Sequence, residues 1–194
     1  DSIRLKSAAL ALWLAASHPI SYADQGRSYD VTMTSEKTGE SIYFTVHEPD
    51  LMTQDERHPL LLSGAGFGGA RDKNRGNVER YLKAGFGVIS FDQRGFGDSQ
   101  APVSVMDPDK DGQNLIQILD WAQSHLDWLA YKNGKLRLGA VGQSYGGGYQ
   151  LSLLANDPKS RLQAIVPQIT WHDLAYSLAP GGVPKTAYGL FLST

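Results

Sequence analysis

The sequence predicts an α/β protein with a mostly parallel sheet, an antiparallel hairpin near its N-terminus and helices on both faces. Two segments that alternate apolar and polar residues, 29–34 and 41–47, flank the turn signal Thr38-Gly39. Four short apolar runs follow, and helical stretches separate them. This alternation is typical of a parallel sheet that is covered on both faces by helices.

Each expected element has its own boundary signals. The strand at residues 59–64 ends in glycine, and Gly85 ends the helix expected over residues 78–84. An apolar stripe from Leu115 to Leu129 predicts an amphipathic helix, with Asn133-Gly134 ending that segment. A third helix is expected before Asp157-Pro158, and the remaining buried strands at residues 87–92, 136–141 and 162–167.

Composition limits the kinds of protein that this chain represents. Its 194 residues are 41% hydrophobic, which is enough for one ordinary globular core. The formal net charge of −2 provides no basic footprint for a nucleic acid or an acidic membrane surface. The absence of cysteine excludes a disulfide scaffold, a thiolate zinc site and a cysteine nucleophile. We expect neither a metal nor a cofactor.

Residues 1–23 have the pattern of a secretory signal peptide, so we expect them to be removed and not to form part of the fold. Arg4 and Lys6 precede the apolar run 8–16, and Ser21-Tyr22-Ala23 resembles a cleavage site. The apolar run is shorter than the ~20 residues that a membrane-spanning helix needs. The mature protein is therefore expected to be secreted or periplasmic, without stable membrane association.

The two ends of the chain suggest a fragment of a longer protein. The chain begins with Asp1, and residues 190–194 resemble the middle of an element. We expect an incomplete core over residues 24–178, followed by the start of a cap or lid over residues 179–194.

The strongest chemical signal is the sequence Gly142-Gln143-Ser144-Tyr145-Gly146, which lies between an expected strand and an expected helix. In this context G-x-S-x-G is a nucleophile elbow, because a tight turn exposes the serine above the sheet and leaves no room for side chains at the glycines. Ser144 is the candidate nucleophile, and the backbone N–H of Tyr145 is a candidate oxyanion donor. A glycine-rich connection with an incidental serine is the alternative interpretation.

A second oxyanion donor is expected from the glycine-rich loop after the first buried strand. Residues 64–69 read Gly-Ala-Gly-Phe-Gly-Gly, and a loop without side chains brings backbone N–H groups close to a substrate. The backbone N–H of Phe67 is the preferred candidate, followed by that of Gly68.

The same loop supports a different class of function. Gly64, Gly66 and Gly69 satisfy the G-x-G-x-x-G pattern of a dinucleotide-binding module, and Asp92 ends the next strand as a ribose-binding acid would. Residues 71–76 delay the following helix, however, whereas this motif needs a helix N-terminus at the glycines to hold pyrophosphate. The dinucleotide interpretation is therefore the weaker one.

Residues 92–99 form the loop after the second buried strand, and their expected role is structural. The glycines of this loop permit positive φ, and Asp92, Arg94 and Asp98 are expected to pair and fix its shape. None of them forms a nucleophile–base pair, so direct catalysis is not expected.

Three segments together resemble the α/β-hydrolase superfamily: residues 64–69, residues 91–99 with the sequence Phe-Asp-Gln-Arg-Gly-Phe-Gly-Asp-Ser, and residues 142–147 with the sequence Gly-Gln-Ser-Tyr-Gly-Gly. More narrowly, they are similar to the Xaa-Pro dipeptidyl-peptidase and cocaine-esterase-like branch. The resemblance covers residues 59–178 and implies the α/β-hydrolase fold with a serine nucleophile. One departure is Ala65, where many relatives carry histidine.

A serine nucleophile needs a base that a third group orients, and in this fold the order along the chain is Ser, then Asp or Glu, then His. His172 is the last histidine in the sequence, and no histidine follows Asp173. These two residues are expected at the wall of the pocket or at the entrance of a cap. The weaker alternatives are Asp173 as the triad acid and His172 as the base, although His172 would break the order along the chain. The triad histidine, and with it the acid, is expected beyond Thr194.

The sequence therefore predicts most of an exported serine hydrolase that cleaves an ester, amide or peptide bond through an acyl-enzyme on Ser144. The fragment by itself is expected to show little or no turnover. The non-enzymatic alternative is a hydrolase-fold binding protein that has lost its triad.

Overall fold

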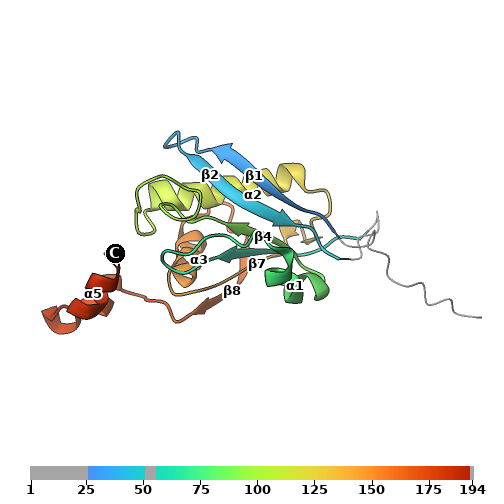
Figure 1. The fold of residues 1–194 in the computed structure, drawn as a ribbon. Coiled ribbons are helices and arrows are strands. Elements are labelled where there is room, and N and C mark those ends of the chain that lie inside the picture. Colours follow the sequence, from blue (N-terminus) through green and yellow to red (C-terminus); the bar gives the residue numbers. More distant parts are fainter. Residues whose placement is uncertain (1–25, 51–55, 193–194) are drawn as a thin grey trace, which may run out of the picture.

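The computed structural model describes residues 26–50 and 56–192, and these residues form a six-stranded mixed sheet. The spatial order is β1-β2-β4-β3-β7-β8 (Figure 1). Strands β1 and β2 and the pair β2–β4 are antiparallel, whereas β4, β3, β7 and β8 run parallel. The strands are β1 (Ser28–Thr34), β2 (Ser41–His47), β3 (Leu60–Gly64), β4 (Gly87–Phe91), β7 (Leu138–Gln143) and β8 (Leu162–Gln168). The predicted fold class, with its antiparallel hairpin, is confirmed.

Helices cover both faces of the sheet because side chains alternate along each buried strand. Leu61 of β3 faces the helix α1 (Arg75–Lys83), where it packs with Val78 and Leu82. Leu60 and Leu62 face the opposite way, into the larger core that α2 (Gln113–His125) and α3 (Tyr145–Asn156) cover. The consecutive apolar residues of β3 therefore pack into a core on each face of the sheet.

The segment between α2 and β7 differs from the prediction. A short π-helical turn, Pro108–Gly112, precedes α2, and α2 ends at His125. Asn133 and Gly134 instead form the turn of a small hairpin between β5 (Tyr131–Lys132) and β6 (Lys135–Leu136). Both turn residues have positive φ, 51° and 75°, as a tight hairpin turn with matching twist requires. Leu126 and Leu129 are buried, but they lie outside the helix, and the predicted end of that helix was wrong.

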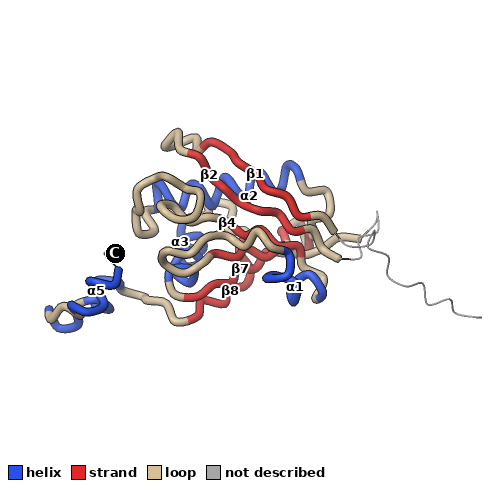
Figure 2. Tube along the Cα trace, viewed as in Figure 1, coloured by secondary structure: helices blue, strands red, loops and turns tan. Residues whose placement is uncertain are grey.

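After β8 the chain leaves the sheet and forms three short helices, α4 (Leu174–Leu178), η3 (Pro180–Gly182) and α5 (Thr186–Leu192). Figure 2 shows this segment beyond the end of the parallel strands, joined to them by loops. It contains the residues 179–192 that the sequence assigns to a cap, an assignment that stays a prediction. The predicted signal peptide, residues 1–23, lies outside the described residues.

In the part of the chain that the structure describes, none of the helices has both the length and the apolar character needed to cross a membrane.

Candidate active site

Ser144 occupies the sharp corner between β7 and α3. Its φ of 56° and ψ of −119° lie in a region that non-glycine residues rarely adopt. The backbone N–H of Ser144 donates to the carbonyl oxygen of Gln168 at 2.8 Å, and its carbonyl oxygen accepts from Gly147 at 2.8 Å. The strained corner is thus fixed from the neighbouring strand and from the first turn of the helix.

The glycines of the motif are required by close backbone approaches. A Cβ on Gly146 would lie 2.1 Å from the carbonyl oxygen of Gly64, and one on Gly142 would lie 2.3 Å from that of Gly146. A Cβ on Gly148 would lie 2.8 Å from the ring of Trp171. The glycine run at the start of α3 therefore lets the loops after β3 and β8 pack directly against the helix.

The structure brings the two candidate oxyanion donors to the same corner. Tyr145 is the first residue of α3, so its backbone N–H has no partner four residues earlier within the helix. The loop after β3 passes alongside, since a Cβ on Gly66 would lie 4.0 Å from Cβ of Ser144. Phe67 follows in that loop, and its ring packs edge-to-face on Tyr145 with 5.5 Å between the ring centroids.

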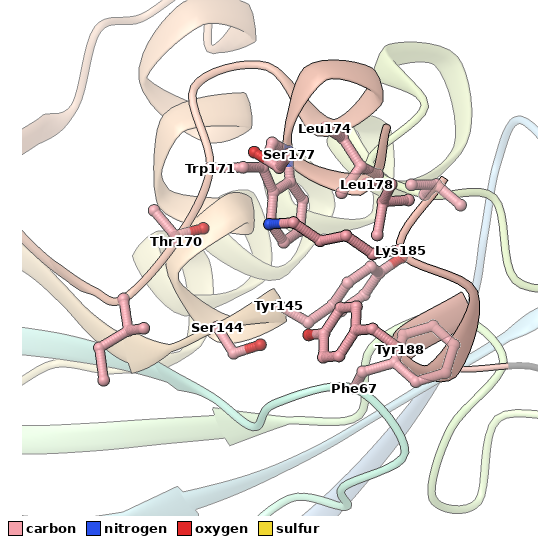
Figure 3. Close-up of a pocket in the computed structure, with 12 residues that line it drawn as sticks. Phe67, Ser144, Tyr145, Thr170, Trp171, Leu174, Ser177, Leu178, Lys185 and Tyr188 are labelled. Atoms are coloured by element: carbon pink, nitrogen blue, oxygen red, sulfur yellow. The ribbon is translucent and has the colours of Figure 1, made fainter. Parts of the chain in front are cut away.

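Ser144, Tyr145 and Phe67 line one pocket of about 540 Å³ (Figure 3). Its walls are mostly apolar. They come from the loop after β3, the loop before α2, the loop after β8, and the short helices that follow this last loop. The other lining residues are Val105, Ile169, Thr170, Trp171, Leu174, Ser177, Leu178, Lys185 and Tyr188. A volume of this size accommodates a small organic substrate.

Gln150 holds the corner in place from inside α3, and sequence reasoning missed it. Its side chain is fully buried. The Nε2 group donates to the carbonyl oxygens of Gly146 at 2.9 Å, Val166 at 3.2 Å and Gly142 at 3.3 Å, and Oε1 accepts from the N–H of Val166 at 2.8 Å. A glutamine within an otherwise apolar helical run was the available signal, because buried amides require partners.

An ion-pair network lies behind the loops that build the pocket. The buried carboxylate of Asp92 pairs with the guanidinium of Arg71 and accepts from the backbone N–H groups of Arg71 at 2.7 Å and Asp98 at 2.9 Å. Arg71 also pairs with the Asp98 carboxylate at 2.8 Å. Arg94 reaches away to Glu40, in the connection between β1 and β2. Pairing of Arg94 with the aspartates was therefore predicted wrongly, because Arg71 from the preceding loop already neutralises both carboxylates.

A strained loop supplies another part of the pocket wall, and no sequence signal indicated it. Val105 and Met106 have φ values of 52° and 64°, which are uncommon for bulky side chains. The Asp111 carboxylate accepts a hydrogen bond from the Ser104 hydroxyl and so holds this loop. Burial raises the pKa of Asp111, and burial together with the Asp111 charge raises the pKa of the Tyr145 phenol.

His172 and Asp173 flank the pocket without lining it. Both are exposed, and the side chain of Asp173 caps α4 by accepting from the N–H of Tyr176 at 2.8 Å. Within residues 26–50 and 56–192 no histidine is hydrogen-bonded to Ser144 Oγ. His47 and His58 bond to the backbone carbonyls of Asp72 and Gly85, both at 2.9 Å.

The geometry does not fit the dinucleotide interpretation of Gly64, Gly66 and Gly69. Helix α1 begins at Arg75 behind the cap Asn74, so the helix that follows this loop in the chain does not start at the glycines, as the dinucleotide motif requires. The Asp92 carboxylate is fully enclosed and engaged by Arg71, which leaves it unable to receive a ribose. Among the described residues, no three or more histidine, aspartate or glutamate side chains lie together as a metal ion would require.

Comparison with protein families matches residues 38–192 to the family described as X-Pro dipeptidyl-peptidase (S15 family). The "Uncharacterized 31.7 kDa protein in traX-finO intergenic region" of Escherichia coli is 31% identical over 170 residues, which covers 84% of this chain and 53% of the relative. The "Quorum-quenching protein AidA" of Acinetobacter baumannii is 31% identical over 123 residues, 62% of this chain and 38% of that protein. The chain thus spans about half the length, or less, of these relatives.

Solved structures share the fold at low sequence identity. A prolyl endopeptidase structure matches 80% of this chain and 23% of its own chain, with a TM-score of 0.62 and 19% identity. Acetyl xylan esterase 1 from Thermoanaerobacterium matches 91% of this chain and 58% of its own chain, with a TM-score of 0.59 and 19% identity. Both comparisons place the sheet and its helices in the α/β-hydrolase fold.

Proposed function

This chain belongs to the S15 X-Pro dipeptidyl-peptidase family of serine hydrolases, and from that membership we propose that Ser144 is the nucleophile for cleavage of an ester, amide or peptide bond. The observation that carries the proposal is the backbone of Ser144. A serine held at φ 56° between a strand and a helix, at the floor of a mostly apolar pocket, has the geometry that an exposed nucleophile requires.

The proposed reaction proceeds through an acyl-enzyme. Ser144 Oγ attacks the carbonyl carbon of the substrate while a base removes the hydroxyl proton. The backbone N–H groups of Tyr145 and Phe67 donate to the oxygen that becomes negatively charged. The alcohol or amine then leaves with the proton, and water releases the acyl group by the same steps.

The base is proposed to come from a part of a longer protein that this chain does not include. The only histidine after Ser144 is His172, which is exposed and does not line the pocket. The partial coverage of the relatives supports the same interpretation. The isolated 194-residue chain is therefore expected to hydrolyse a p-nitrophenyl ester little faster than buffer, and robust turnover that depends on Ser144 would contradict this.

An active-site fluorophosphonate probe on the full-length protein tests the nucleophile directly. We expect covalent labelling that the Ser144→Ala variant abolishes and that peptide mass spectrometry assigns to residue 144. Ser177→Ala is the matched control, because Ser177 lines the same pocket and its hydroxyl donates to the carbonyl oxygen of Asp173 at 2.6 Å. Equal labelling of the wild type and Ser144→Ala would refute the assignment.

A binding protein on the same fold remains the second candidate. The observation in its favour is that no histidine among the described residues contacts Ser144. It predicts that the full-length protein retains a ligand in the pocket but is not labelled by the fluorophosphonate. The labelling experiment therefore separates the two candidates.

Export is proposed from the first residues of the sequence. The basic start, the short apolar run and the small-residue pattern ending at Ala23 support cleavage before Asp24. The measurement is the N-terminal sequence of the protein recovered from the periplasm or the medium. An intact N-terminus in the cytoplasmic fraction would refute export.

A further inference from the structure

Lys185 places a positive charge in a pocket whose described lining residues include no carboxylate. No side chain among residues 26–50 and 56–192 forms an ion pair with its ammonium group. The backbone holds the residue at the pocket, because its N–H donates to the carbonyl oxygen of Leu178 at 2.8 Å and its carbonyl oxygen accepts from Gly189 at 2.9 Å. In Figure 3 the side chain runs across the pocket toward the wall that carries Thr170 and Trp171.

A second polar group on that wall also lacks a partner. The Thr170 hydroxyl is buried and makes no hydrogen bond within the described part of the chain. It lies close to the first turn of α3, since a Cβ on Gly147 would be 3.1 Å from Thr170 Oγ1. Buried hydroxyl groups in proteins normally have a hydrogen-bond partner. This hydroxyl has almost no accessible surface, so the Lys185 ammonium, and not the Thr170 hydroxyl, is the donor on this wall that a ligand reaches.

We infer that this pocket selects substrates that carry a carboxylate on an apolar body, an inference that rests on the proposed hydrolase function. The carboxylate accepts from the Lys185 ammonium, while Phe67 and Trp171 pack on the apolar part.

The charge preference is measured with two ligands of nearly identical shape, 4-phenylbutyrate and 4-phenylbutanamide. Each is titrated by calorimetry at pH 7 into the chain carrying Ser144→Ala, which prevents turnover. We expect the carboxylate to bind roughly five- to tenfold more tightly than the amide, as one partly screened ion pair with a hydrogen bond provides. The preference should shrink in 0.5 M NaCl because salt screens exposed charges.

Variants identify the groups responsible. Lys185→Met should remove the preference, because it removes the ammonium group and keeps most of the side-chain length. Lys132→Met is the matched control, because Lys132 is exposed on β5 and does not line the pocket. Equal affinity for the two ligands, binding of neither, or a preference that survives Lys185→Met would each overturn the inference.

The outcome is independent of the nucleophile test. A protein that is labelled at Ser144 but binds both ligands equally loses the carboxylate inference and keeps the proposed function. A protein that prefers the carboxylate but is not labelled loses the nucleophile and keeps the binding site.

Discussion

Removal of the Gln150 amide should destabilise the fold at the nucleophile corner. The side chain pairs with Val166 as a neighbouring strand would, accepting from its N–H and donating to its carbonyl oxygen, and it also donates to the carbonyl oxygen of Gly146. Gln150→Leu leaves these backbone groups without that partner in a fully buried position. The two short bonds contribute about 1 kcal/mol each, and an orphaned donor adds a further penalty, so we expect a loss of about 2–3 kcal/mol.

The measurement is urea denaturation followed by far-UV circular dichroism. With a urea dependence of about 2–3 kcal/mol per molar, the expected loss lowers the midpoint by about 1 M. Gln163→Leu is the matched control, because Gln163 is exposed on the same strand, β8, and surface substitutions change stability by about 0.5 kcal/mol or less. A midpoint for Gln150→Leu that equals the control value would show that the amide does not hold the corner.

Three further predictions concern packing, charge and pH. Gly146→Ala should lower the free energy of unfolding in urea by about 1–3 kcal/mol, because its Cβ would meet a backbone carbonyl oxygen. Gly189→Ala is the control: its Cβ would meet open space, and the same measurement should show no loss. Asp92→Asn leaves the buried Arg71 without its fully buried partner and should cost about 3 kcal/mol in urea denaturation; a loss below 1 kcal/mol would refute a structural role for the pair. Burial lowers the pKa of His47 in the folded state, so the unfolded chain binds more protons and stability should fall as the pH drops below about 6.5. Denaturation between pH 5 and 8 checks this, and a His47→Gln curve parallel to the wild type would contradict it.

The parallel strands and the corner at Ser144 were predictable from the sequence because local signals specify them. Each buried strand is a short apolar run, and a glycine-flanked serine between a strand and a helix has few other structural explanations. The end of α2 was not predictable from its stripe, because Leu126 and Leu129 are buried for reasons of tertiary packing after the helix has ended. The Asn133-Gly134 pair is itself a hairpin signal, and this turn chemistry overrides the apolar periodicity that extends beyond the helix.

The residues of the pocket wall were harder to predict from the sequence than the corner at Ser144. His172 and Asp173 were assigned to the wall from their position after β8, yet their neighbours Trp171 and Leu174 line the pocket. Which residues of a short loop face inward depends on backbone angles that residue types do not determine. Val105 reaches the pocket through an unusual φ, and Lys185 through a turn closed by Leu178, and neither feature has a local sequence pattern.

Residues 169–190 line much of the pocket and contribute no buried residue to the fold. The core is built from other positions, among them residues of β3, β4, β7 and α3, although Thr170 and Trp171 pack against the first turn of α3. Selection on substrate range and selection on folding therefore act on separate sets of residues. Substitutions at the exposed positions of this wall should cost little stability, whereas the glycines and Gln150 at the corner make close backbone contacts that other residues would break. Related proteins are therefore expected to differ in ligand specificity while they keep the same fold.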